Sequence, residues 1–168
     1  MHQRPECINN RSEIGHWECD LVFQQGNQSQ NILSAVERKS RMVIVVKNSS
    51  KHTETVIEGI KTAKMNNPYP MATITFDNGS EFADHTKLGR DTYFCDPGSP
   101  WQKGAIENIN GIIRRCIDYK VNPNDINQNI LDAVAEKLNT RTRKILGFLT
   151  PFEGINKLYK VKLESVAF

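Results

Sequence analysis

Hydrophobic and polar positions divide the first third of the chain into short strand-like runs. Stretches rich in valine, isoleucine and leucine lie at residues 17–23, 31–37 and 42–46, and this composition is typical of β-strands. Only short polar connections separate them, at residues 24–30 and 38–41. We therefore expect the three strands to form an antiparallel meander joined by hairpins.

Beyond residue 50 the spacing of apolar residues becomes helical and alternates with short apolar runs. Two further strands are expected at residues 72–76 and 92–95. Helices are expected over residues 52–65, 80–88, 104–119 and 127–139, with a last one opening at Pro151. Strands that first meander and then alternate with helices predict an α/β fold. Its five-stranded mixed sheet, three strands antiparallel and two parallel, would be flanked by helices.

The composition fits one domain. A chain of 168 residues with 38% hydrophobic residues can bury one core, so we expect a single domain at residues 11–168 after an extension at residues 1–10. No apolar run is long enough to span a membrane, which predicts a cytoplasmic protein. The four cysteines lack the spacing of a zinc site and are expected to be free thiols. Net charge is only +3, which is compatible with a polyanionic partner without requiring one.

Three acidic residues occupy positions at which they can meet. Asp20 lies within the first predicted strand, Asp77 ends the fourth, and Glu107 lies near the start of the helix expected after the last strand. If the first and fourth strands are parallel neighbours about 4.8 Å apart, both aspartates project from the same end of the sheet. Such a cluster calls for bound cations, and magnesium prefers carboxylate ligands. Two such ions about 4 Å apart catalyse in-line phosphoryl displacement.

Each acid also has an ordinary structural explanation. Asp77 opens an Asp-Asn-Gly sequence, which is often only a turn, and Glu107 falls on the polar face of its helix, where glutamates are usually solvated. Asp20 is harder to explain in this way, because an acid inside an apolar strand is unfavourable unless it faces a polar site. The three acids together are more informative than any one of them.

Polar residues near the acids are candidates for supporting roles. His16 and Glu18 share the strand face of Asp20 by alternation, so an accessory role is possible for both. Asn78 and Asn110 are accessory candidates next to the other two acids. Positioning or packing is the alternative for each of them.

Aromatic and basic residues after residue 100 are candidates for contacts with a nucleic acid. Trp101 follows a loop with two prolines, where its ring could stack on a base or pack into the core. Candidate phosphate contacts are Lys103, Arg114, Arg115, Lys120, Arg141, Arg143 and Lys144. Each of these cations could equally be a solvated surface residue.

Several stretches around these residues are specific enough to indicate a family. They are IGHWECDLV at 14–22, VERKSR at 36–41, FDNGSEF at 76–82, YFCDPGSPWQKG at 93–104, ENING at 107–111, LNTRTRK at 138–144 and TPFE at 150–153. With them, the sequence strongly resembles the transposases of the insertion-sequence-thirty family, a branch of the DDE enzymes related to retroviral integrases. The resemblance covers about residues 11–153 in family order.

The resemblance implies a ribonuclease H-like fold and a chemistry. Asp20, Asp77 and Glu107 would be the catalytic, metal-binding acids, and the activity would be DNA strand cleavage and transfer. Two Mg²⁺ ions, with Mn²⁺ as a substitute, would be the cofactors. DNA, as transposon ends and target, would be the partner of a homodimer or higher multimer, with neither a membrane nor a small-molecule substrate.

Some positions depart from the family pattern. Cys19 stands where the family typically has glycine, Thr142 replaces a usual proline, and the segment between Asp77 and Glu107 is about four residues shorter. The family's amino-terminal helix-turn-helix domain is expected to be absent, with poor recognition of transposon ends. These departures leave two alternatives open: a catalytically impaired remnant that folds and binds DNA weakly, and a nuclease of the same fold.

Overall fold

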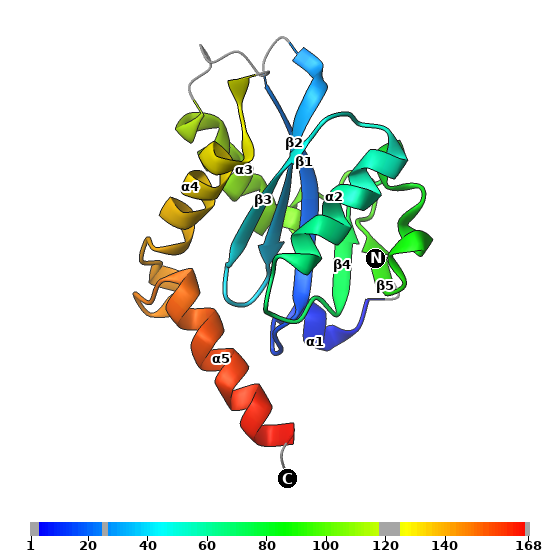
Figure 1. The fold of residues 1–168 in the computed structure, drawn as a ribbon. Coiled ribbons are helices and arrows are strands. Elements are labelled where there is room, and N and C mark those ends of the chain that lie inside the picture. The colour runs from blue at the N-terminus through cyan, green and yellow to red at the C-terminus, as the bar shows by residue number, and fades with distance from the viewer. Residues whose placement is uncertain (1–3, 25–26, 118–124, 167–168) are drawn as a thin grey trace.

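A five-stranded sheet, in the order β3-β2-β1-β4-β5, forms the centre of the protein (Figure 1). The structure is a computed structural model that describes residues 4–24, 27–117 and 125–166. The strands are β1 His16–Gln24, β2 Asn27–Glu37, β3 Val43–Asn48, β4 Thr73–Phe76 and β5 Asp91–Phe94. β1, β2 and β3 pair antiparallel, whereas β4 is parallel to both β1 and β5. The mixed sheet predicted from the sequence is therefore confirmed.

Helices cover both faces of the sheet. They are α1 Glu6–Asn9, α2 Thr53–Met65, α3 Gly104–Cys116, α4 Gln128–Asn139 and α5 Pro151–Val166. α2 packs on one face, whereas α3 and α4 pack on the other. α5 leads away from the sheet in Figure 1. None of the helices in the described ranges is long and apolar enough to cross a membrane.

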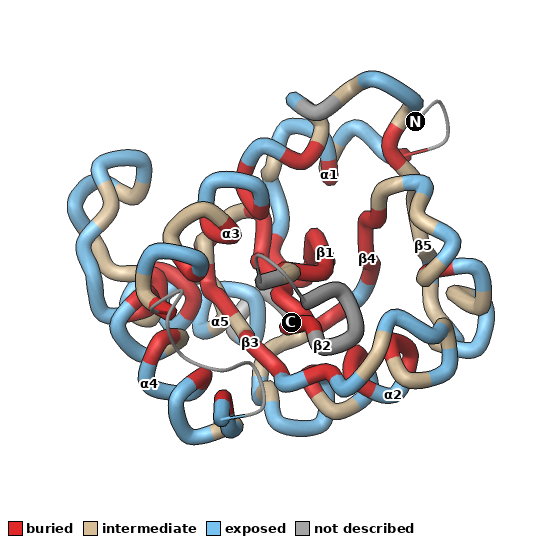
Figure 2. Tube along the Cα trace, turned by 90° about the horizontal axis from the view of Figure 1, so that it is seen from above, coloured by how far each residue is buried: buried red, intermediate tan, exposed pale blue. Residues whose placement is uncertain are grey.

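Strand alternation in β1 builds a core on each side of the sheet. Trp17 and Leu21 belong to the apolar cluster that includes Ile60 of α2. Val22 belongs to the opposite cluster, with Ile109 of α3. In Figure 2 the buried residues gather along the central strands of the sheet. The even-numbered positions of β1 therefore point toward α3, and the first of the three candidate acids is one of them.

The prediction of a short helix between β4 and β5 is wrong. Two 3₁₀ turns, η1 Ser80–Phe82 and η2 His85–Leu88, stand in its place. Phe82 is fully buried and stacks on Phe76, with ring centroids 4.4 Å apart. Because Phe82 must return to the end of β4 only a few residues after leaving it, the chain turns tightly instead of forming a regular helix.

The end of α3 also differs from expectation. α3 ends at Cys116, earlier than predicted, because Ile117 leaves the helical conformation (φ −94°, ψ 107°) and is buried in the core beside α3. Residues 118–119 of that prediction lie outside the described residues. The expected extension at residues 1–10 contains α1, and its Ile8 and the preceding Arg4 are both buried.

Candidate active site

Asp20 and Asp77 lie close together because β1 and β4 are parallel neighbours. Glu18 is paired with Thr75 in this ladder. The same register, continued by two residues, sets Asp20 beside Asp77, which is the first residue beyond β4. Adjacent strands lie about 4.8 Å apart, so both carboxylates leave the sheet at the same end.

The turn after β4 uses one carboxylate oxygen of Asp77 and leaves the other to the pocket. The backbone N–H of Gly79 donates to Asp77 Oδ1 at 3.1 Å, as in an Asx turn. The neighbouring Asn78 donates from Nδ2 to the carbonyl oxygen of Cys95 at 2.7 Å, which ties this turn to the loop after β5. The turn explanation and a functional role for Asp77 are thus compatible.

Lys103 inserts its ammonium between the two aspartates. It ends the 3₁₀ turn η3 Pro100–Lys103, directly before α3. Its Nζ lies 3.1 Å from Asp77 Oδ2 and 3.4 Å from Asp20 Oδ2, and its side chain is 5% exposed. One internal cation therefore serves both acids. A DNA contact by Lys103 stays a prediction.

Electrostatics explain why this pair needs a cation. Burial raises the pKa of Asp20, the ammonium of Lys103 opposes that change, and Asp77 adds to it. Burial alone would lower the pKa of Lys103, but the two carboxylates outweigh it and the pKa lies above its ordinary value. Lys103 is therefore protonated at neutral pH. A single ammonium does not balance all the acids of this pocket.

A chain of hydrogen bonds from β2 to α3 orients Asp20. Ser34 Oγ donates to Asn110 Oδ1 at 2.7 Å, and Asn110 Nδ2 donates to Asp20 Oδ2 at 3.0 Å. The N–H of Leu21 donates to Asp20 Oδ1 at 2.9 Å. Sequence reasoning missed Ser34, although its place opposite Asp20 in the β1–β2 hairpin was a usable signal.

Glu107 lies in the first turn of α3 and lines the same pocket as the two aspartates. The pocket encloses about 310 Å³, and Asn78 and Lys103 also line it. Glu107 is exposed and makes no hydrogen bond or ion pair with another described residue. We call the pocket lined by Asp20, Asp77 and Glu107 the acid pocket. The carboxylate oxygens of these three residues suit a hard divalent cation, provided that the ammonium of Lys103 moves aside.

Glu18 holds the start of α3 against the sheet. It is fully buried, pairs with Arg38, and accepts a hydrogen bond from the backbone N–H of Ile106 at 3.1 Å. The backbone N–H groups of a first helical turn have no partner within the helix, and a carboxylate there is favourable. Through this contact Glu18 fixes the helix turn that carries Glu107. Arg38 was not foreseen in this role.

His16 lies at the other end of β1 from the acid pocket. Asp20 lies four positions further along the strand, which corresponds to about 13 Å. His16 Nδ1 is 2.9 Å from Thr73 Oγ1, and burial lowers the pKa of this histidine. With Cys7 and Glu13 it forms a group whose potential metal-ligand atoms lie within 4.8 Å of one another. This group is separate from the three candidate acids.

The basic residues predicted to contact DNA lie in several different parts of the structure. A groove of about 480 Å³ is lined by Arg115, Lys137, Arg141, Arg143 and Lys144, which we call the basic groove. Arg114 is exposed on α3 and does not line this groove, while Lys120 lies outside the described residues. Trp101 is 73% exposed, so its predicted alternative of packing into the core is wrong. Stacking on a base stays a prediction.

The chain is similar in sequence to transposases of bacterial insertion sequences. It is 40% identical over 162 residues to the transposase InsI for insertion sequence element IS30A of Escherichia coli (strain K12), covering 94% of this chain and 42% of that protein. It is 39% identical over 158 residues to the transposase for insertion sequence element IS1086 of Cupriavidus metallidurans, covering 91% and 46%. The chain thus spans a little under half the length of these relatives. No protein-family model matches it.

The fold is that of integrase catalytic cores. The catalytic core domain of BIV integrase superposes with a TM-score of 0.68 at 22% identity, covering 89% of this chain and 98% of that chain. The HTLV-2 integrase catalytic core domain in complex with magnesium gives 0.63 at 17% identity, covering 85% and 97%. The predicted ribonuclease H-like fold is therefore confirmed. The predicted resemblance is confirmed as well: 94% of the chain is similar in sequence to the transposase for insertion sequence element IS30A.

Proposed function

We propose that this chain is the catalytic core of a transposase that cuts DNA strands and joins them to a target. The observation that supports this best is the convergence of Asp20 Oδ2 and Asp77 Oδ2 on one cation, the ammonium of Lys103. Glu107 lines the same pocket. A sequence relative that covers nearly the whole chain is a transposase. In the proposal, Asp20, Asp77 and Glu107 are the catalytic acids.

The proposed cofactors are two Mg²⁺ ions, for which Mn²⁺ can substitute. Support comes from the oxygen-rich lining of the acid pocket and from a fold neighbour, the HTLV-2 integrase core, that was solved in complex with magnesium. When bound, such ions stabilise the attacking and leaving oxygens of a phosphoryl transfer. The three acids would hold them.

The chain's own residues have distinct parts in this proposal. Asn110 and the N–H of Leu21 orient the carboxylate of Asp20, and Gly79 does the same for Asp77. Lys103 keeps the two aspartates together before cations bind. It then turns toward the DNA, where its charge offsets that of a phosphate.

The proposed substrates are transposon ends and a target DNA. By its relatives, the protein would act in the cytoplasm of a bacterium as a homodimer or higher multimer. The candidate DNA contacts also remain part of this proposal: Lys103, Arg114, Arg115, Arg141, Arg143, Lys144 and Trp101.

Nicking and strand transfer on labelled duplex DNA with Mg²⁺ or Mn²⁺ test the proposal. We expect Asp20→Asn to lower the rate at least about a hundredfold, because it removes a charged ligand oriented toward the reacting centre. Asp132→Asn makes the same chemical change on the exposed side of α4 and should leave the rate within about twofold. Equal rates for the unchanged protein and Asp20→Asn would reject the assignment.

A further inference from the structure

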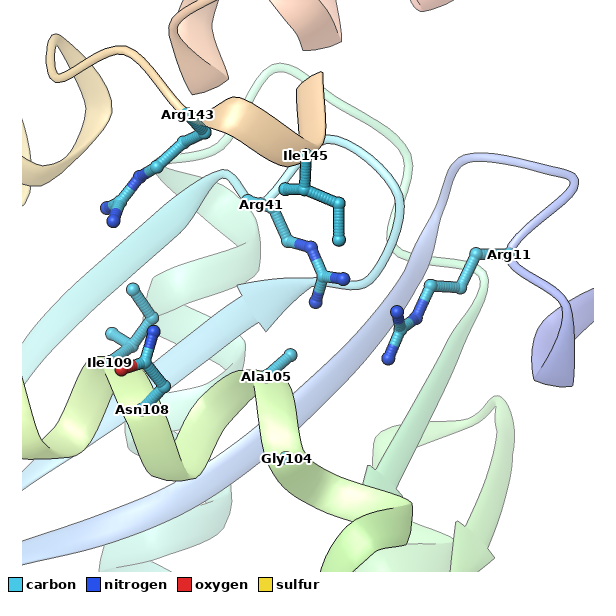
Figure 3. A pocket seen from close by; sticks show the side chains of 8 residues that line it. All are labelled: Arg11, Arg41, Gly104, Ala105, Asn108, Ile109, Arg143 and Ile145. Atoms are coloured by element: carbon cyan, nitrogen blue, oxygen red, sulfur yellow. The ribbon is translucent and has the colours of Figure 1, made fainter. Parts of the chain in front are cut away.

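A second pocket lies on another flank of α3, and arginines line it. It encloses about 290 Å³ between the start of α3 and the turns facing it. Its lining includes Arg11, Arg41 and Arg143, together with Gly104, Ala105 and Asn108 of α3. Figure 3 shows Arg11 and Arg41 extending toward the space beside the start of α3. We call it the arginine pocket.

The three arginines come from separate parts of the chain. Arg11 precedes β1, Arg41 lies in the turn between β2 and β3, and Arg143 directly precedes the 3₁₀ turn η5 Lys144–Leu146. Arg11 (φ 58°) and Arg41 (φ 64°) both have left-handed backbone conformations. That conformation costs a residue with a side chain about 1–2 kcal/mol. Arginine therefore stands at two positions whose backbone favours glycine or asparagine.

The positive charge of the arginine pocket is offset only from outside its lining, where Glu18 and Glu37 act on Arg41. No acidic residue is among the described residues that line it. The Nε atoms of Arg11 and Arg143 are buried without a hydrogen-bond partner. Burial and the neighbouring charge of Arg11 lower the pKa of Arg41, and the carboxylates of Glu18 and Glu37 oppose this without reversing it. Buried polar groups are normally satisfied, so these donors lack an acceptor that a bound anion would supply.

We infer that the arginine pocket binds a backbone phosphate of the DNA whose cleaved bond lies in the acid pocket. The inference rests on the proposed function. Guanidinium groups match the oxygens of a phosphate, and the start of a helix adds favourable polarity. Glu107 lines the acid pocket whereas Ala105 and Asn108 line this one, so a single helical turn separates the two sites.

Continuity with the basic groove favours DNA over a small anion. Arg143 lines both the arginine pocket and the basic groove, where Arg115 and Arg141 follow. A strand held by Arg143 therefore meets further cations along its backbone. A small anion would need only the three arginines.

DNA binding without metal tests the inference. Fluorescence anisotropy of a labelled duplex in EDTA, at several NaCl concentrations, gives Kd and its salt slope. Arg11→Asn and Arg41→Asn suit the left-handed backbone and remove the charge. Each should raise Kd about five- to tenfold and lower the slope of log Kd against log salt by about one. An unchanged Kd and slope in both folded variants would overturn the inference.

A variant that keeps every arginine gives an independent test. Asn108→Asp places a carboxylate in the arginine pocket, so it should weaken DNA binding about tenfold while raising Tm. Asn129→Asp makes the same change near the start of α4 and should change Kd less than about twofold. Similar Kd values for these two variants would overturn the inference, because an arginine cluster with only a structural role predicts that result.

Failure of this inference is distinguishable from failure of the proposed function. Binding in EDTA requires no catalysis, and Asp20→Asn should bind DNA with unchanged dependence on Arg41. If the protein never cuts DNA but loses binding with Arg41→Asn, the phosphate site stands and the proposed activity fails. If it cuts DNA while the arginine variants bind normally, only the phosphate site fails.

Discussion

The acid pocket and the arginine pocket flank the same helical turn, but their charges are balanced in opposite ways. In the acid pocket, Lys103 Nζ lies 3.1 Å from Asp77 Oδ2 and 3.4 Å from Asp20 Oδ2. In the arginine pocket no acid is among the described lining residues, and Glu18 and Glu37 only partly offset the charge of Arg41 from outside it. In our proposals, the acid pocket exchanges the ammonium of Lys103 for divalent cations, and the arginine pocket receives a phosphate of the DNA.

The largest expected effect comes from the residue that supports both pockets. Glu18→Gln keeps an acceptor for the N–H of Ile106 but leaves the buried Arg38 without its counter-charge. Breaking a buried ion pair in this way costs about 3–5 kcal/mol. Urea unfolding followed by circular dichroism should show that loss. Glu136→Gln, on the exposed face of α4, is the control, and a similar stability for the two variants would contradict the role given to Glu18.

A smaller change in stability is expected when Lys103 is removed from the acid pocket, and it should depend on the presence of a metal ion. Lys103→Ala should lower the free energy of unfolding in EDTA by roughly 2 kcal/mol, because two carboxylates lose their charged partner. Ca²⁺ should then stabilise this variant more than the unchanged protein, since the cation no longer competes with an ammonium. Thermal unfolding with and without Ca²⁺ measures both quantities. Lys61→Ala, at an exposed position of α2, is the control. Equal increases in Tm on adding Ca²⁺ to all three proteins would contradict the proposed exchange of the ammonium for a metal ion.

The smallest effect concerns pH. Because burial raises the folded-state pKa of Asp20 above its ordinary value, the folded state binds this proton more tightly than the unfolded chain. Its contribution to stability is therefore greatest at low pH and declines as pH rises through the folded pKa. Asparagine at position 20 cannot ionise, so without metal the stability of Asp20→Asn relative to the unchanged protein should improve as the pH rises above about 4. Parallel pH dependences of the two unfolding free energies would contradict this.

The closeness of Asp20 and Asp77 could be predicted because it depends on regular structure alone. Apolar runs of the right length marked β1 and β4, and a parallel pairing leaves little freedom in where their ends lie. The position of Glu107 followed from helical periodicity in α3. Those patterns also located most of the sheet and its helices.

Contacts made from irregular segments could not be predicted in this way. Lys103 reaches the aspartates from a 3₁₀ turn, whose direction depends on the loop before it. The size of Trp101 allowed either burial or exposure, and the same turn decides between them. Arg11, Arg41 and Arg143 share no spacing or motif, so nothing in the sequence marks them as a group.

The left-handed conformation of Arg11 and Arg41 has a consequence for selection experiments. Neither side chain makes a hydrogen bond or ion pair with another described residue, whereas glycine at either position would relieve backbone strain. A library screened for thermal resistance alone should therefore drift away from arginine at both positions. A library screened for DNA binding should retain it, and the disagreement between the two screens would identify the residues kept for binding at the expense of folding.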